Sequence, residues 1–290
     1  MNASSEEVPS PYPLPPTPYP LPSAPSIRVV VSGAGKMGRE IIGGLCREPD
    51  IDPVGVLEKF SGEDLFSLPD GSGRLIPRSS EPALLNRVRP DVLVDFSHHE
   101  WTAQVVPLAI ELGVRPVIGT TSLPEALIQR FANDCAAAKL GGLIAANFAL
   151  GAVLLMHLAG IAAPFFDNVE VIELHHDQKV DAPSGTAGSI LQALLAGRNG
   201  KPFNYPETTK QTLPGTRGGE YQGAAVHSVR LPGLVAHHEV IFGSTGQILT
   251  LRHDSTSRES FLPGVLLAVR EVMKRQELVQ GLDRLLGLTS

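Results

Sequence analysis

The sequence predicts an α/β protein in which an α+β domain with a mixed sheet is inserted into a domain built from βαβ units. Near the N-terminus, the apolar run Ile27–Ser32 leads into a glycine-rich segment, residues 33–38, and then into a helical pattern that ends near Cys46. Strand-like runs then alternate with helix-like runs, which is typical of a parallel sheet covered by helices. Beyond residue 187 the pattern changes to strands joined by long connections, which favours a second, mixed sheet.

The glycine-rich segment reads G-x-G-x-x-G and contains Gly33, Gly35, Lys36, Met37 and Gly38. Glycines at this spacing allow a tight turn, a close approach of the backbone to a pyrophosphate, and close packing of helix on strand. Glu58 follows the next expected strand, residues 53–57, where a carboxylate can accept hydrogen bonds from a ribose. This arrangement predicts a Rossmann-type domain that binds a nicotinamide dinucleotide, with a plain βαβ turn as the alternative.

The composition argues against some classes of partner. The 290 residues carry a formal net charge of −6, with an isoelectric point near 5.8, which disfavours nucleic acid or an anionic membrane surface. Only Cys46 and Cys135 are present, so we expect no disulfide framework and a reducing cytoplasm. Residues 141–166 carry no charge over a length that could span a membrane, but polar residues, glycine and proline interrupt them. We interpret this run as a buried strand, a turn and a core helix.

Residues 1–25 are rich in proline and contain Pro-Tyr-Pro-Leu-Pro twice. Proline lacks the backbone donor that a sheet needs, and such segments favour an extended polyproline II structure. We expect a disordered, solvated tail, with a ligand for a polyproline-recognising partner as the alternative.

Residues 173–187 hold the densest group of reactive side chains and read Glu-Leu-His-His-Asp-Gln-Lys-Val-Asp-Ala-Pro-Ser-Gly-Thr-Ala. The alternating run 169–174 predicts a strand, and the apolar run 187–195 predicts a helix. Ser184 or Thr186 can cap that helix, and its first N–H groups then form an anion site.

Two adjacent histidines and a lysine lie between this strand and this helix. Because neighbouring strand residues point to opposite faces, we expect His175 and His176 to have different roles. With the mobile charge of Lys179, the group suits a small carboxylate substrate that must receive a proton. Each residue alone has an ordinary structural reading. A metal site that includes Asp177 is a less favoured alternative, because no third ligand occurs at a suitable spacing.

The order of these residues closely resembles the signature of the 4-hydroxy-tetrahydrodipicolinate reductase (dihydrodipicolinate reductase) family. Other segments resemble the family in the same order along the chain: Val-Asp-Phe-Ser at 94–97, Gly-Thr-Thr at 119–121, Ala-Ala-Asn-Phe at 145–148, Ser-Val-Arg at 228–230 and a closing helical run at 257–270. The resemblance covers residues 27–275. The glycine-rich loop differs, because the family usually has one more residue there.

The resemblance implies the reduction of 4-hydroxy-tetrahydrodipicolinate to tetrahydrodipicolinate with NADH or NADPH, in the diaminopimelate and lysine route, by a cytoplasmic homotetramer. It implies that His175 is the general acid and Lys179 the proton donor or charge stabiliser. The implied substrate-binding residues are His176, Ser184, Gly185, Thr186 and Arg230. Besides the glycine-rich segment and Glu58, the implied cofactor-binding residues are Gly119, Thr120, Thr121, Ala146, Asn147 and Phe148.

Two of these residues carry alternatives. Arg230 suits a carboxylate because its planar guanidinium donates two parallel hydrogen bonds, but a surface arginine paired with a glutamate is also compatible with the sequence. Glu58 favours NADH because a carboxylate repels a 2′-phosphate, whereas Lys59 and Lys36 can offset that repulsion. We therefore expect both cofactors to serve, with NADH preferred less than about a hundredfold.

The implied domain organisation places the dinucleotide-binding domain at residues 26–147 and 255–290. The substrate-binding and tetramerisation domain then covers residues 148–254. Two other functions stay open, namely a reductase of another small dicarboxylate and a non-catalytic nucleotide-binding relative. The presence of His175, Lys179 and Arg230 argues against the second, because a protein without catalysis has no need of them.

Overall fold

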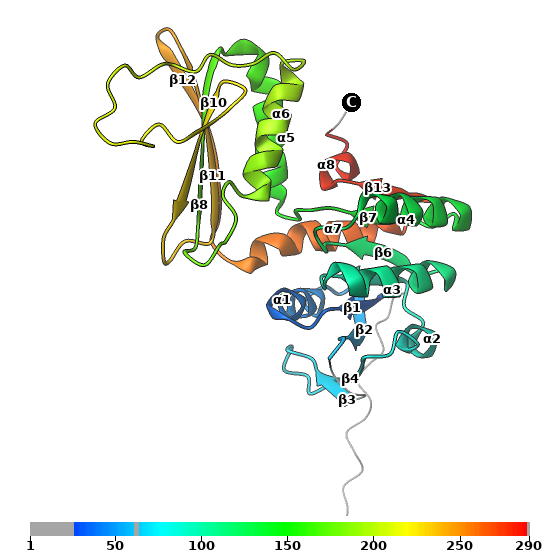
Figure 1. The fold of residues 1–290 in the computed structure, drawn as a ribbon. Coiled ribbons are helices and arrows are strands. Elements are labelled where there is room, and N and C mark those ends of the chain that lie inside the picture. The colour runs from blue at the N-terminus through cyan, green and yellow to red at the C-terminus, as the bar shows by residue number, and fades with distance from the viewer. Residues whose placement is uncertain (1–25, 61–63, 289–290) are drawn as a thin grey trace, which may run out of the picture.

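The structure, a computed structural model, describes residues 26–60 and 64–288. The proline-rich segment 1–25, for which the sequence predicts a disordered tail, lies outside the described residues. The described chain forms two β-sheets with helices packed against them, and only two connections join the two parts (Figure 1). The predicted α/β class, with a Rossmann-type part and a second mixed sheet, is confirmed.

The first sheet has eight strands in the order β13-β7-β6-β5-β1-β2-β4-β3. Every neighbouring pair is parallel except β3 and β4, which form an antiparallel hairpin at one edge. Its strands are β1 Ile27–Ser32, β2 Ile51–Leu57, β3 Asp64–Ser67, β4 Leu75–Ser79, β5 Val92–Asp95, β6 Arg115–Ile118, β7 Gly142–Ile144 and β13 Leu278–Gln280. The sequence pattern did not indicate β13.

Helices cover both faces of the first sheet. One face carries α1 (Lys36–Leu45) and α7 (Leu262–Val272), and the opposite face carries α2 (Leu84–Val88), α3 (His99–Glu111) and α4 (Glu125–Ala138). Two short helices complete this part, namely η2 (Arg258–Phe261) before α7 and α8 (Leu282–Leu285) after β13.

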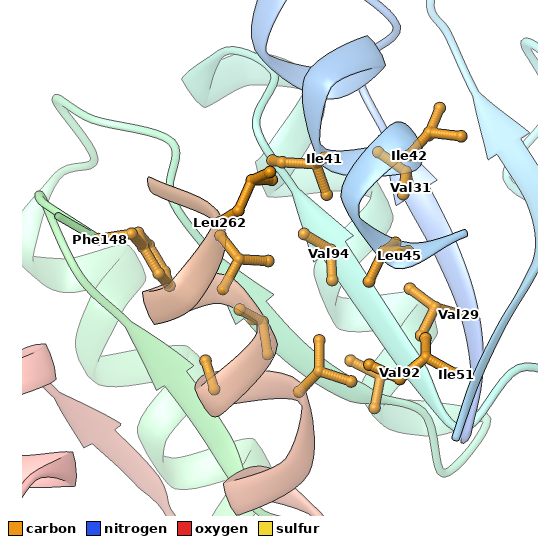
Figure 2. Packing of buried hydrophobic residues seen from close by; sticks show 14 of the residues in the cluster. Val29, Val31, Ile41, Ile42, Leu45, Ile51, Val92, Val94, Phe148 and Leu262 are labelled. Carbon is orange, nitrogen blue, oxygen red and sulfur yellow. The ribbon is translucent and has the colours of Figure 1, made fainter. Parts of the chain in front are cut away.

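Alternation along β1 supplies side chains to both cores. Val29 and Val31 join the cluster beneath α1 and α7, whereas Val30 joins the cluster on the opposite face. Figure 2 shows the first cluster, in which Leu45 of α1 lies near Val29 and Leu262 of α7 lies near Ile41 of α1. Because helices bury both faces, the strand is apolar on both sides, as a parallel strand in the middle of a sheet requires.

The glycine-rich turn joins β1 to α1 as predicted. Gly33 has a φ of +93°, which favours glycine. A Cβ on Gly38 would lie 1.7 Å from the carbonyl oxygen of Gly33, so the helix can approach the turn only if this residue has no side chain. A Cβ on Gly35 would meet no atom within 4 Å, so the loop is open at the start of α1. This open loop at a helix N-terminus fits a pyrophosphate.

The second sheet has five strands in the order β12-β11-β8-β10-β9. β8 and β10 are parallel and the other pairs are antiparallel, so the sheet is mixed, as predicted. Its strands are β8 Asn168–His175, β9 Gly219–Tyr221, β10 Ala224–Arg230, β11 Ala236–Ser244 and β12 Gln247–Ser255. Helices α5 (Leu150–Ala162) and α6 (Gly185–Gly197) pack on one face, and the short η1 (Ala163–Phe165) follows α5. β9 is a three-residue strand that follows the long connection after α6.

The uncharged run 141–166 forms β7, a connection and α5, as interpreted from the sequence. The term core helix is only partly correct for α5, because Leu154, Leu158 and Ile161 are each more than 40% exposed. Within residues 26–60 and 64–288, no helix is long and apolar enough to cross a membrane.

Candidate active site

A cavity of about 1360 Å³ lies between the two parts of the molecule. Its walls come from the segment after β6, the β7–α5 connection, the β8–α6 segment, both helices of the second part and the region of α8. The predicted site residues that line it are Thr121, Ala146, Asn147, His175, Lys179, Ser184, Gly185 and Thr186. Since pockets for drug-sized ligands occupy roughly 300–1,000 Å³, this cavity has room for a small substrate beside part of a cofactor.

His175 ends β8 on the face that the helices cover. It is buried, and its Nδ1 makes a short hydrogen bond with Oε2 of Glu173. Burial lowers the pKa of His175 from its usual value, and the Glu173 carboxylate opposes this shift without cancelling it. His176, the next residue, is exposed and does not line the cavity. The two histidines therefore have different surroundings. The sequence predicted this, because neighbouring strand residues point to opposite faces.

Arg230 contacts Glu173 and does not line the cavity. Its Nη1 donates to Oε2 of Glu173 over 3.0 Å, and its Nη2 donates to Oε1 over 2.7 Å. Burial, the largest influence, raises the pKa of Glu173, but hydrogen bonds from Arg230, Ser228 and His175 outweigh it and the pKa is lowered. Parallel pairing places Arg230 opposite His175 and Ser228 opposite Glu173, which brings the guanidinium of Arg230 to the Glu173 carboxylate.

Lys179 lies at the edge of the cavity, in the segment between β8 and α6. Its Nζ donates to Oδ1 of Asp181 over 2.7 Å, and this hydrogen bond is the main cause that lowers the pKa of Asp181. The main chain of Asp181 also accepts a hydrogen bond from Nη2 of Arg230 over 2.6 Å. Because Asp181 is more than half exposed, the ion pair is screened by water, and the ammonium can exchange it for a substrate carboxylate.

The predicted anion site at the start of α6 is built around Ser184. Its Oγ accepts a hydrogen bond from the backbone N–H of Ala187 over 3.2 Å, so Ser184, rather than Thr186, is the helix cap. Gly185 and Thr186 begin the helix, where backbone N–H groups have no partner inside the helix. Thr186 Oγ1 instead accepts a hydrogen bond from Asn147 over 3.3 Å, which ties α6 to the connection from β7.

His238 is a buried neighbour whose position only the folded sheet reveals. Its ring centroid lies 5.3 Å from that of His175, and its Nε2 lies 3.3 Å from Oγ of Ser184. Burial lowers the pKa of His238 to about 4, so it is uncharged near neutral pH. It thus supports the inner wall of the cavity without adding a charge.

On the nucleotide side, a buried carboxylate organises the ends of three strands. Asp95, at the end of β5, accepts hydrogen bonds of 2.5 to 2.7 Å from the hydroxyls of Ser32, Ser97, Thr102 and Thr120. Thr120 was predicted to bind the cofactor, but its hydroxyl is turned inward to Asp95 and only 6% of the residue is exposed. Its side chain therefore fixes the loop, and any contact with a cofactor is left to the main chain.

Phe148 and Gly119 both pack against Phe96. Phe148 is fully buried in the first core, with its ring centroid 5.2 Å from that of Phe96. Its side chain lies in that core and does not line the cavity. A Cβ on Gly119 would lie 2.3 Å from the Phe96 ring, so this loop position requires glycine.

Glu58 follows β2, and its carboxylate has a cation beside it that the sequence did not reveal. Nη1 of Arg78, on the neighbouring strand β4, lies 3.5 Å from Oε2 of Glu58, while Nε of Arg78 donates to Asp64 over 2.6 Å. Lys59, which was expected to offset Glu58, instead pairs with Glu100 at 3.3 Å. Arg78 reaches this place because β2 and β4 are parallel neighbours with Val56 opposite Arg78.

Lys36 and Met37 complete the predicted cofactor-binding residues. Lys36 is exposed in the first turn of α1, and Met37 packs against the first core. His98 occupies the N-cap position of α3 without a capping hydrogen bond from its side chain, and its ring centroid lies 6.3 Å from that of His99. In the part of the chain that the structure describes, no group of three or more histidine, cysteine or acidic side chains is arranged to hold a metal ion.

Comparison with known proteins agrees with this geometry. Two family models match the chain, described as dihydrodipicolinate reductase, N-terminus, over residues 27–148, and dihydrodipicolinate reductase, C-terminus, over residues 151–286. The 4-hydroxy-tetrahydrodipicolinate reductases of Moorella thermoacetica and Dehalococcoides mccartyi are 47% and 45% identical, over 90% of this chain and 98% and 99% of theirs.

Solved structures give the same answer. A dipicolinate-bound dihydrodipicolinate reductase from Paenisporosarcina sp. TG-14 matches with a TM-score of 0.79 and 40% identity, over 89% of this chain and 99% of that one. An amine dehydrogenase from Mycobacterium smegmatis, 18% identical with a TM-score of 0.62, shares the fold alone. The resemblance that the sequence carried is confirmed, and the chain belongs to the dihydrodipicolinate reductase family of oxidoreductases.

Proposed function

We propose that this chain reduces 4-hydroxy-tetrahydrodipicolinate to tetrahydrodipicolinate with NADH or NADPH, with loss of water, in the route to diaminopimelate and lysine. The observation that carries the proposal is the shared cavity, in which His175, Lys179 and the start of α6 face the loops that follow β6 and β7. A dicarboxylate is recognised at such a place because cationic and N–H donors converge there. The relative from Paenisporosarcina is named as bound to dipicolinate, which is also a dicarboxylate.

The residues divide the work between binding and proton transfer. The N–H groups of Gly185 and Thr186 would hold one carboxylate, and Lys179 would release Asp181 to hold charge on the substrate. His175 would supply a proton from the wall of the cavity. The nicotinamide supplies the hydride chemistry. Gly35 would let the pyrophosphate approach the start of α1, while Gly33 and Gly38 shape the tight turn beneath it.

His176 and Asn147 lie beside these groups and would support them. His176 is exposed and does not line the cavity, so we propose that it reaches the substrate from the rim. Asn147 joins the two parts through Thr186, and we propose that this contact makes the β7–α5 connection a hinge. A hinge at this place would let the two walls of the cavity close on substrate and cofactor together.

The test is an assay of cofactor oxidation with substrate generated enzymatically. We expect NADH or NADPH oxidation that depends on this substrate, whereas other small dicarboxylates support little or none. Oxidation with another dicarboxylate only would indicate a different reductase on the same fold. Cofactor binding without any turnover would indicate a non-catalytic relative.

A further inference from the structure

His175 has a partner to which the sequence assigned no role. Glu173 lies two residues earlier on β8, so both side chains point to the face that the helices cover. Its carboxylate is fully buried, and Oε2 is shared by Nδ1 of His175 and Nη1 of Arg230. Oε1 accepts from Nη2 of Arg230, so the guanidinium fork that could grip a substrate carboxylate grips Glu173.

We propose that Glu173 is the positioning residue that fixes the tautomer of His175, and that Arg230 acts through Glu173 instead of on the substrate. An ionised carboxylate can only accept hydrogen bonds, so Nδ1 of His175 must carry a proton. Nε2 is then the nitrogen that takes up and releases a proton at the cavity wall. The proposal rests on the reduction proposed above, in which His175 supplies a proton to the substrate.

Arg230 makes this arrangement possible inside the protein. A buried carboxylate without a counter-charge is strongly unfavourable, and it would take up a proton and lose its influence on His175. The two hydrogen bonds from Arg230 and the one from Ser228 keep Glu173 ionised. Arg230 is itself anchored, because its Nη1 donates to the main chain of Val229 and its Nη2 to that of Asp181.

The charges around the His175 ring have opposite effects. Among the charged groups that act on it, Glu173 raises its pKa, whereas Lys179 and Arg230 lower it. The neighbouring His238 on β11 is uncharged near neutral pH, and Ser184 at the start of α6 is neutral. Removing the charge of Glu173 must therefore lower the pKa of His175, and removing the charge of Arg230 as well must partly restore it.

The sign of the pH effect follows from the role of His175 as an acid. Activity that needs protonated His175 falls as pH rises through its pKa. This fall is the alkaline limb of the pH–activity profile. In Glu173→Gln the limb should move to lower pH by roughly one to three pH units, the usual effect of a nearby opposite charge. In the double variant Glu173→Gln/Arg230→Gln, the limb should lie between those of the single variant and the wild type.

The experiment records kcat and KM against pH for the wild type and both variants. Both variants are near in size to the wild type, and the double variant leaves no unpaired charge inside the protein. A matched control is Glu170→Gln, because Glu170 lies on the same strand and pairs with Arg217 and His227, but on the opposite face of the sheet. Its limb should stay in place. A substrate KM that rises with loss of Arg230 while the limb stays fixed would overturn the proposal and assign Arg230 to substrate.

A second readout needs no substrate. Nitrogen-15 spectra of histidine-labelled protein give the tautomer and the titration midpoint of His175, with a His175→Asn variant to assign its signal. We expect the Nδ1–H tautomer in the wild type and a lower midpoint in Glu173→Gln. If the midpoint moves but the substrate is not reduced, the proposed function fails and the positioning role stands. If the substrate is reduced but neither midpoint nor limb moves, the positioning role fails.

Discussion

Lys179 lines the cavity and pairs with Asp181, which is 52% exposed, so water screens this ion pair and a ligand carboxylate can replace it. Replacing Lys179 with Ala should lower kcat by roughly 10²–10⁴, the usual cost of losing a positioned proton-transfer group. Steady-state kinetics at saturating substrate measure this loss. The Kd of the cofactor should change little, because Lys179 belongs to the second part of the chain.

The matched control is Lys274→Ala. Lys274 makes a similar ion pair with Glu271 at 2.7 Å, but it lies outside the cavity. This variant should keep wild-type kcat and KM. If Lys179→Ala retained more than about half of the wild-type activity, Lys179 would not belong to the catalytic group, because loss of such a group costs far more.

We propose that Glu58 governs the choice between NADH and NADPH. Its carboxylate should repel a 2′-phosphate and accept hydrogen bonds from a ribose, while Arg78 beside it weakens the repulsion. We therefore expect NADH to be preferred less than about a hundredfold, and Glu58→Ala to gain relative kcat/KM with NADPH. In the double variant Glu58→Ala/Arg78→Gln, this gain should be smaller, because the guanidinium left beside the phosphate is gone. A strong NADPH preference in the wild type that Glu58→Ala leaves unchanged would show that this carboxylate does not face the ribose.

At the scale of elements, the turn between β1 and α1 separates two uses of glycine. Gly38→Ala places a Cβ within 1.7 Å of a backbone oxygen, so the helix must move and the melting temperature should fall by several degrees. Gly35→Ala meets no atom within 4 Å, so its melting temperature should stay near that of the wild type. Its KM for the cofactor should rise, because the added methyl group occupies the space left for the pyrophosphate. Equal loss of stability in both variants would contradict this division.

Most elements were predictable because their patterns are local. The strand and glycine turn at 27–38, the strand that ends at His175 and the helix after Ser184 all follow from apolar periodicity and capping. β13 was missed because three residues are too few to show a pattern, and only pairing with β7 makes them a strand. β9 was missed for the same reason, since its partner β10 determines where it forms.

The site was predictable where one segment supplies it and unpredictable where several do. His175, Lys179 and Ser184 come from one run of residues, and the structure places all three at one cavity. The contact of Arg230 with Glu173 depends on the register of β8 with β10, which the sequence alone does not show. Arg78 and His238 depend on strand pairing in the same way. The side chains of Thr120 and Phe148 turn inward and are buried, which the local sequence pattern does not show.

At the scale of the whole molecule, no helix within residues 26–60 and 64–288 packs on one face of the second sheet. α5 and α6 cover the face that carries Val171, Val240 and Phe242, so the alternate residues point outward. Ile172 and Ile241 lie on that outer face, and Ile248 at its edge is 74% exposed. A sheet that presents aliphatic side chains to water is an expected site of association.

We propose that four copies associate through this outer face, in keeping with the tetramer that the sequence led us to expect. Ile241→Lys places a charge in the middle of the face, on a strand paired on both sides, so it should disrupt association without unfolding the sheet. Light scattering coupled to size exclusion should give about four times 30.8 kDa for the wild type and a smaller mass for the variant. Leu65→Lys is the control, because Leu65 is 59% exposed on β3 of the first sheet, and its mass should equal that of the wild type. A wild-type mass near that of one chain would contradict the proposal of a tetramer. If Ile241→Lys still formed a tetramer, the interface would lie on another surface.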